Sequence, residues 1–201
     1  NTLAWAAALY YLIHSTLIAA AFYLFCGWMT FQRGVFKDHL KVAPRIKQQK
    51  TAALTYFIIA LMMAGLPPFS GFFGKVFILQ ATAGTAYQAW IIAIILIVSL
   101  LSILAFTPVG FILFWRASPP EDDPNQTAYR TYEALPDRAP KRNDIAIYTI
   151  LAGLMAYVVF AAPIQRYTFA TVQQIQNHAL YNQVILKTDA QDRAISVQPF
   201  D

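Results

Sequence analysis

The most informative segment of the chain is Gly65-Leu66-Pro67-Pro68-Phe69-Ser70-Gly71-Phe72-Phe73-Gly74-Lys75. It lies inside an apolar run from about Ala52 to Ala83, and Lys75 is the one Asp, Glu, Lys or Arg residue of that run. A charged amine at bilayer depth is energetically costly, and such residues usually line a pathway for ions or protons. The glycines and prolines just before the lysine predict a break in its helix. A charge beside a broken helix in one apolar span is typical of transporters.

The composition favours a membrane protein. The chain has 201 residues, of which 58% are hydrophobic, 15% aromatic and 12% charged, whereas about a quarter of the residues in soluble domains are charged. The net charge of +5 does not indicate nucleic-acid binding, because the basic residues lie mainly in two connecting loops, as in a membrane topology signal. The single cysteine, Cys26, excludes an intrachain disulfide, and we expect a buried, inert thiol.

Four apolar runs reach the length of about 20 residues that crosses a bilayer. They cover about residues 3–31, 52–83, 89–115 and 145–162. We therefore expect an all-α fold, a fragment of a polytopic membrane helical bundle with about four transmembrane helices, one of them discontinuous. The chain starts at Asn1 with neither an initiator methionine nor a signal peptide, and we interpret it as the C-terminal part of a longer membrane protein.

The segment after Pro163 differs from the spans. Apolar side chains recur there at near-helical spacing among Gln, Asn, Thr and Arg residues. This pattern predicts an amphipathic helix that lies on the outer membrane interface or against partner subunits. We therefore divide the chain into a transmembrane part, residues 1–163, and an amphipathic helix with a loose polar tail, residues 164–201.

The loop after the first span sets the orientation. Residues 32–50 contain a single acid, Asp38. Their basic residues are Arg33, Lys37, Lys41, Arg45, Lys47 and Lys50. By the positive-inside rule this loop is cytoplasmic. Residues 116–144 then return to the cytoplasm, and the C-terminal tail ends on the outer side of the membrane.

The residues around the break predict its geometry. Pro67 and Pro68 lack backbone donors, so a helix arriving from Thr51 should end near Gly65, and a new helix can begin at the prolines. Irregular backbone at membrane depth is tolerated only where protein or a water-filled cavity satisfies it. We assign Gly65, Pro67, Pro68 and Gly71 to the break.

Lys75 lies deep in its span. The helix from Lys75 to Ala83 is about 12 Å long, and half of the hydrocarbon core is about 15 Å. A low-dielectric environment disfavours the charged form of a lysine, so such an amine can take up and release a proton. The alternative is that Lys75 pairs with a carboxylate on another helix and only fixes packing. Because no predicted span contains an acid, that partner would lie outside this sequence.

His14 is the second candidate for a proton relay, in the middle of the first apolar run. Histidine titrates in the physiological range and suits a proton shuttle, although a hydrogen-bonded packing role is the alternative. The hydroxyl groups that could support a chain of water molecules are those of Ser15, Thr16, Ser70, Ser99 and Ser102. For most of them the alternative is a hydrogen bond to the backbone of their own helix.

Residues 64–75 resemble the late broken helix of the antiporter-like proton-channel family, through the pattern Gly-Leu-Pro-Pro-x-Ser-Gly-Phe-x-x-Lys. That family includes the large membrane subunits of respiratory complex I and the A and D subunits of Mrp-type cation/proton antiporters. Residues 9–17 resemble the histidine-bearing helix that precedes the broken one. The spelling around His14, the Phe-Trp-Arg end of the third span and the tail from residue 162 favour the D subunit, in its Pha-type form.

The resemblance implies a function. Lys75 would correspond to the family's terminal-channel lysine and His14 to its relay histidine. The chain would then be a proton-conducting membrane subunit of a Na⁺ or K⁺/H⁺ antiporter, which is a transporter without cofactors and not an enzyme. Its partners would be the other membrane subunits of the antiporter, the lipid bilayer, protons and Na⁺ or K⁺, in a bacterial inner membrane.

Two positions depart from the family pattern. Many relatives carry a lysine four residues after the histidine, where this chain has Ile18, so the relay would need water or other groups. Relatives often have a basic residue near the end of the third span, where this chain has Pro108, which predicts a kink. There are two alternative functions: a proton-pumping subunit of respiratory complex I, part of an NADH:quinone oxidoreductase, and a non-conducting packing or assembly segment.

Overall fold

The computed structural model describes residues 1–36, 39–41, 43, 46, 48–116 and 141–177. Over these ranges the regular structure is entirely helical, so the predicted all-α fold is confirmed. Helix α1 spans Thr2–Gln32, and a short 3-10 helix, η1, follows at Gly34–Phe36. The other helices are α2 (Gln49–Ala64), α3 (Ser70–Thr82), α4 (Gln88–Gly110), the π-helix η2 (Phe111–Trp115), α6 (Lys141–Val159) and α7 (Ala161–Gln176).

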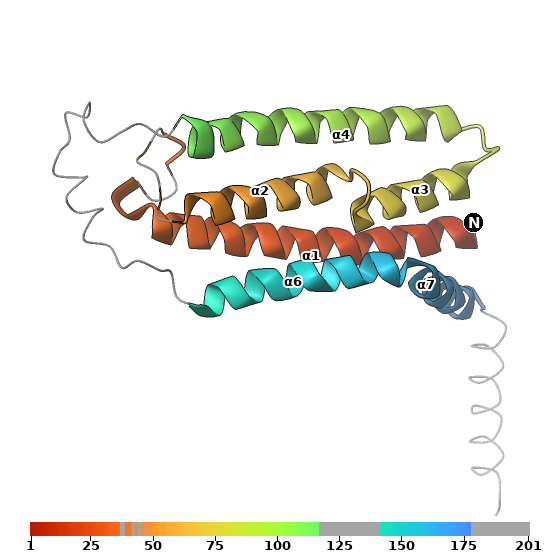
Figure 1. Cartoon of the computed structure of the whole chain (residues 1–201). Coiled ribbons are helices and arrows are strands. Elements are labelled where there is room, and N and C mark those ends of the chain that lie inside the picture. Colours follow the sequence, from red (N-terminus) through yellow and green to blue (C-terminus); the bar gives the residue numbers. More distant parts are fainter. Residues whose placement is uncertain (37–38, 42, 44–45, 47, 117–140, 178–201) are drawn as a thin grey trace, which may run out of the picture.

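Helix α1 is the central element of the bundle. It packs against α2, α3, α6 and α7, while α4 packs on α2 and α3 at the outside (Figure 1). The largest fully buried apolar side chains come from α1, α2 and α6: Tyr10, Phe25, Ile59, Met62 and Leu154. No residue of α4 is buried. The core therefore lies around α1, and α4 is its least covered neighbour.

Side-chain contacts define the two ends of the bundle. At one end Gln49 Nε2, at the start of α2, donates to the Phe114 carbonyl over 2.9 Å. At the other end Asn1 Nδ2 donates to the Ala81 carbonyl over 3.0 Å. Figure 1 shows the end of α1 and the start of α6 at the same end as Gln49. The helix ends that flank residues 33–48 and 117–140 thus lie together, as expected for two loops on one side of a membrane.

The predicted helix break is present between α2 and α3. Gly65 ends α2 in the left-handed region, at φ 70°, where its N–H bonds to the Met62 carbonyl and the next N–H to the Leu61 carbonyl. This pattern satisfies carbonyls at a helix C-terminus. The expectation that the new helix begins at the prolines was wrong. It begins at Ser70, because extended backbone at Phe69 forms its N-cap.

Two elements are long and apolar enough to cross a membrane: α1, with 31 residues, and α4 with η2, with 28. Helix α2 is shorter, with 16 residues, or about 24 Å, and α3 continues the run beyond the break. Helix α6 covers most of the predicted fourth span, but the chain then bends by 81° into α7. The count of four spans stays a prediction.

Helix α7 contains the first part of the predicted amphipathic segment. It begins at Ala161 and carries Pro163 in its first turn, where proline is tolerated. Tyr167 and Ile175 are exposed on it, whereas Thr168 and Val172 are buried. The remainder of that prediction, residues 178–201, lies outside the described residues.

Two local expectations are modified by the structure. Cys26 is exposed, so the prediction of a buried thiol was wrong: it lies on a side of α1 that the other described helices leave uncovered. Pro108 lies inside α4 without ending it, and the helix changes type three residues later, where the Arg116 N–H bonds to the Phe111 carbonyl. A π-helix is one way in which a chain absorbs a local break in α-helical hydrogen bonding.

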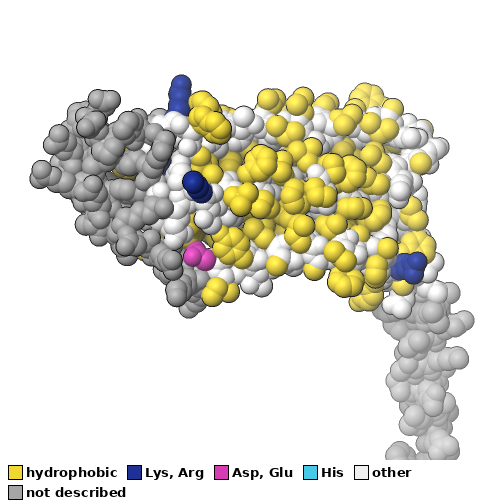
Figure 2. Space-filling model, in the orientation of Figure 1, with side chains coloured by type: hydrophobic (Ala, Val, Ile, Leu, Met, Phe, Trp, Pro, Cys, Tyr) yellow, Lys and Arg dark blue, Asp and Glu magenta, His cyan; other side chains and the backbone are white. Residues whose placement is uncertain are grey.

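The surface has the distribution of a membrane protein. Figure 2 shows hydrophobic side chains across the middle of the bundle, with the visible charged side chains toward its two ends. Large exposed apolar residues are spread along α4, among them Trp90, Leu96, Leu100 and Leu104. Water would not stabilise such a surface, whereas lipid or neighbouring apolar helices would.

Candidate functional site

The site is built around the break between α2 and α3. His14 reaches it from α1, where its side chain is 2% exposed. The imidazole Nδ1 lies 2.8 Å from Ser70 Oγ, which is fully buried in the first turn of α3. His14 also interacts with the carbonyl of Met62 at the end of α2. One histidine thus contacts both halves of the broken helix.

Gly71 permits this close approach. A Cβ atom at this position would lie 2.8 Å from His14 Nε2 and 2.7 Å from the Met62 carbonyl oxygen, closer than real Cβ contacts. Gly71 lies in the first turn of α3 and not in the turn between the helices. Its role in the structure is therefore to let α1 and the end of α2 pack against the start of α3.

Lys75 reaches back across the break. It belongs to the second turn of α3, and helical side chains tilt toward the N-terminus of their own helix. Its Nζ donates to the Ala64 carbonyl, the last of α2, over 2.5 Å, and to Ser99 Oγ on α4 over 2.7 Å. The lysine side chain is 9% exposed. The amine therefore joins α2, α3 and α4 at the break.

The surroundings of Lys75 stabilise a positively charged amine without a carboxylate partner. The C-terminus of a helix carries a partial negative charge of about half an elementary charge, and Lys75 Nζ bonds directly to the C-terminal carbonyl of α2. Among the residues that the structure describes, the one acid is Asp144, which lies at the loop end of α6. The carboxylate partner considered for Lys75 is thus absent from the described part of the chain, and neutral dipoles hold the amine.

The other predicted hydroxyl groups take different positions. Ser15 and Thr16 both donate to the Leu12 carbonyl of their own helix, over 3.0 and 2.9 Å, and are not near the break by any described contact. Ser102 likewise donates to the Val98 carbonyl. Within the described part of the chain, Ser70 and Ser99 are the two hydroxyls that contact the candidate relay residues.

The structure brings His14 and Lys75 into one site. A Cβ atom at Gly65 would clash with the Lys75 side chain, and one at Gly71 would lie 2.8 Å from His14 Nε2 and 3.1 Å from Gly65 Cα, so both side chains lie against the same glycine-containing break. Ile18, where the family pattern has a lysine, is 3% exposed and packs in the apolar core, so it adds no polar group to this site. Sequence reasoning had no signal for the Ala64 carbonyl or for the pairing with Ser99, because both depend on how separate helices are placed.

The fold and the site define a class of protein. A buried lysine and histidine at the break of a discontinuous helix, inside an apolar helical bundle, are features that recur in membrane transport proteins. The profile of the family described as "NADH:quinone oxidoreductase/Mrp antiporter, TM" matches residues 1–103. The chain belongs to this family, and its relatives place it with the Mrp antiporter proteins of the D type.

Two curated relatives give the measure of that similarity. The D subunit of a Na⁺/H⁺ antiporter from Alkalihalophilus pseudofirmus is 30% identical over 185 residues, which cover 92% of this chain and 35% of the relative. The protein of the same name from Bacillus subtilis is 34% identical over 129 residues, or 64% of this chain and 25% of the relative. The chain thus spans about a third or less of the length of these two relatives.

Proposed function

We propose that this chain conducts protons, through Lys75 and His14, in a membrane subunit of a Na⁺/H⁺ or K⁺/H⁺ antiporter. The observation that carries the proposal is the set of partners of Lys75. A carbonyl and a hydroxyl hold its amine, and neither needs a counter-charge when the proton leaves. A lysine locked in an ion pair would leave an unpaired buried carboxylate at that moment, at a high energetic cost.

His14 is the second member of the proposed relay. Its Nδ1 shares a hydrogen bond with Ser70, and the imidazole can act as donor or acceptor according to its tautomer. Ser70 and Lys75 both belong to α3, so this short helix connects the hydrogen-bond partner of His14 to the Lys75 amine. In this proposal Ser70 and water take the place of the missing lysine at position 18.

The relatives support antiport over redox-driven pumping. The family description covers both classes, but the two relatives reported above are named antiporter subunits. We therefore place the chain in a transporter and not in an oxidoreductase, with the other antiporter subunits as its partners. The complex I alternative requires that the purified complex reduce quinone with NADH; the proposal requires that it does not.

We further propose that the end of the bundle holding Gln49 and Phe114 faces the cytoplasm of a bacterial inner membrane. Helix α1 ends and α2 begins at this end, and the described basic residues between them and at the start of α2 include the exposed Lys41 and Lys50. The start of α7 would then lie near the outer side. Labelling of single cysteines in intact cells tests this: a cysteine at position 41 should be protected and one at position 167 accessible to an impermeant reagent.

The substitution Lys75→Ala tests the proton relay. In everted membrane vesicles the variant complex should lose cation-dependent proton movement almost completely, because the titratable group is gone. Assembly is measured in parallel by the recovery of all subunits after purification. The matched control is Lys50→Ala, which removes an exposed lysine from the first turn of α2 and should leave antiport unchanged.

Normal antiport in an assembled Lys75→Ala complex would overturn the proposal. If the variant fails to assemble, the packing alternative gains support. A second variant that keeps the positive charge then separates the hydrogen bonds of the amine from its ability to release a proton.

A further inference from the structure

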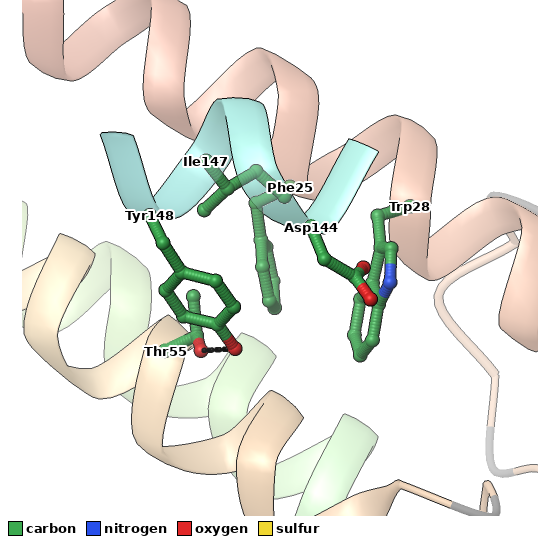
Figure 3. Close-up of a pocket in the computed structure, with 6 residues that line it drawn as sticks. All are labelled: Phe25, Trp28, Thr55, Asp144, Ile147 and Tyr148. Carbon is green, nitrogen blue, oxygen red and sulfur yellow. Dashed lines mark hydrogen bonds between the residues drawn. The ribbon is translucent and has the colours of Figure 1, made fainter. Parts of the chain in front are cut away.

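A small cavity lies away from the break, between α1, α2 and α6. It is close to the end of α1 and the start of α6, at the loop end of the bundle. Its volume is about 10 Å³. The residues that line it are Phe25, Trp28, Thr55, Asp144, Ile147 and Tyr148 (Figure 3). No step of the proposed relay uses this cavity.

One of the residues that line this cavity, Trp28, carries an unpaired donor. Its side chain is 3% exposed, and within the described part of the chain its Nε1 has no hydrogen-bond partner. A buried donor without a partner is energetically costly. Buried N–H groups in proteins are almost always paired with protein or with an ordered water molecule. We therefore expect an acceptor for the indole N–H beside Trp28.

Acceptors for a bridging molecule stand around the same cavity. Asp144 lines the cavity from α6, together with Trp28 from α1 (Figure 3). On the other side, Thr55 Oγ1 and Tyr148 OH share a hydrogen bond of 3.3 Å. The three helices thus contribute a donor from α1, a hydroxyl from α2, and a hydroxyl and a carboxylate from α6.

The size and polarity of the cavity select the ligand. A water molecule needs a cavity of about 10–15 Å³ and two to four polar partners, and this cavity offers both. A larger organic ligand does not fit. A metal cation is disfavoured, because the indole N–H would point its positive end toward the ion, whereas a water oxygen accepts that proton.

We propose that this cavity binds one ordered water molecule that joins α1, α2 and α6. The water accepts a hydrogen bond from Trp28 Nε1 and donates to the Asp144 carboxylate and to the Thr55–Tyr148 pair. It thereby satisfies the buried indole and fixes Asp144 in the first turn of α6, where a carboxylate also favours the helix N-terminus. Through this water molecule, the start of α6 is hydrogen-bonded to α1 and α2.

Density maps of the intact complex, at a resolution that shows ordered water, test this proposal directly. We expect one peak within hydrogen-bond distance of Trp28 Nε1 and of an Asp144 oxygen. A dry cavity would overturn the proposal, and so would a peak surrounded by oxygens at distances shorter than hydrogen bonds, which would indicate a cation. This result is independent of whether Lys75 conducts protons.

A double-mutant cycle on the intact complex provides the second test. Trp28→Phe and Asp144→Ala should each lower the melting temperature, and together they should lower it by less than the sum, because both act through one water. Trp5→Phe, at a 61% exposed tryptophan of the same helix, should combine additively with Asp144→Ala. Additive effects of Trp28→Phe and Asp144→Ala would contradict a shared ligand.

Discussion

The two sides of α3 are packed very differently. On the α1 side, His14, Ser70 and Gly71 meet without room for an added methyl group. On the α4 side, Lys75 reaches a helix that has no buried residue. The histidine is thus held by a rigid surface, whereas the lysine bonds to the least covered helix of the bundle.

Because of this difference in packing, we expect the hydroxyl groups of Ser70 and Ser99 to contribute differently. Ser70 is fixed by packing, so its bond to His14 depends on the fold and survives small changes elsewhere. Ser99 is a half-buried residue of α4, which makes its bond to Lys75 easier to open. Elements with few buried contacts are those that move at low energetic cost. Apart from the two relay residues themselves, we therefore expect a substitution at Gly71 on the tight side to be tolerated least and one at Ser99 on the open side to be tolerated most.

The substitution Gly71→Ala should have the largest effect in this comparison. The added Cβ would meet the Met62 carbonyl oxygen, which cannot move as a flexible side chain would. Overpacking of this kind costs about 1–3 kcal/mol, more than the gain of about 1 kcal/mol in helix propensity. We expect a lower melting temperature and a loss of antiport. The control is Gly27→Ala on α1, which has open space around it and should be neutral or stabilising.

His14→Ala should impair antiport less than Lys75→Ala does, because water can partly replace the imidazole beside Ser70. The measurement is proton movement in everted vesicles, normalised to the amount of assembled complex. Ser15→Ala, next to it on the exposed side of α1, should have no effect. If His14→Ala blocks assembly while the assembled fraction transports normally, His14 is a packing residue.

The smallest effect is expected on the open side, from the hydroxyl of Ser99. Ser99→Val and Ser99→Thr have the same shape, but only threonine keeps the hydroxyl that accepts from Lys75. We expect a partial loss of transport in the valine variant and recovery in the threonine variant. The hydroxyl of Ser102 bonds only to its own helix in the described contacts, so the variants Ser102→Val and Ser102→Thr should transport equally well. Equal transport by Ser99→Val and Ser99→Thr would remove Ser99 from the relay.

The sequence predicted the parts of this site that depend on local chemistry. Pro67 and Pro68 cannot continue a helix, so the break and its approximate ends follow from the residues themselves. Lys75 can likewise be recognised from the sequence as a candidate site residue, because it is an isolated charge in an apolar run. The roles of Lys75 and His14 as relay residues stay predictions, because contacts alone do not show that a proton moves.

The sequence could not predict the parts that depend on tertiary placement. The bond from Lys75 to Ala64 requires the Lys75 side chain to reach back along α3 to the end of α2, and the bond to Ser99 requires the register of α4 against α3. The exposure of Cys26 depends on which side of α1 the other helices cover. The unpaired indole of Trp28 is visible only once three helices surround it.

Antiport by a Lys75→Arg complex separates the charge of Lys75 from its ability to release a proton. Arginine keeps a positive charge and hydrogen-bond donors for the Ala64 carbonyl and Ser99, but it does not release its proton under protein conditions. If Lys75 is a relay, the complex should assemble like the wild type and should not move protons in everted vesicles. Wild-type antiport by this variant would show that the charge at position 75 is structural, and would contradict the account.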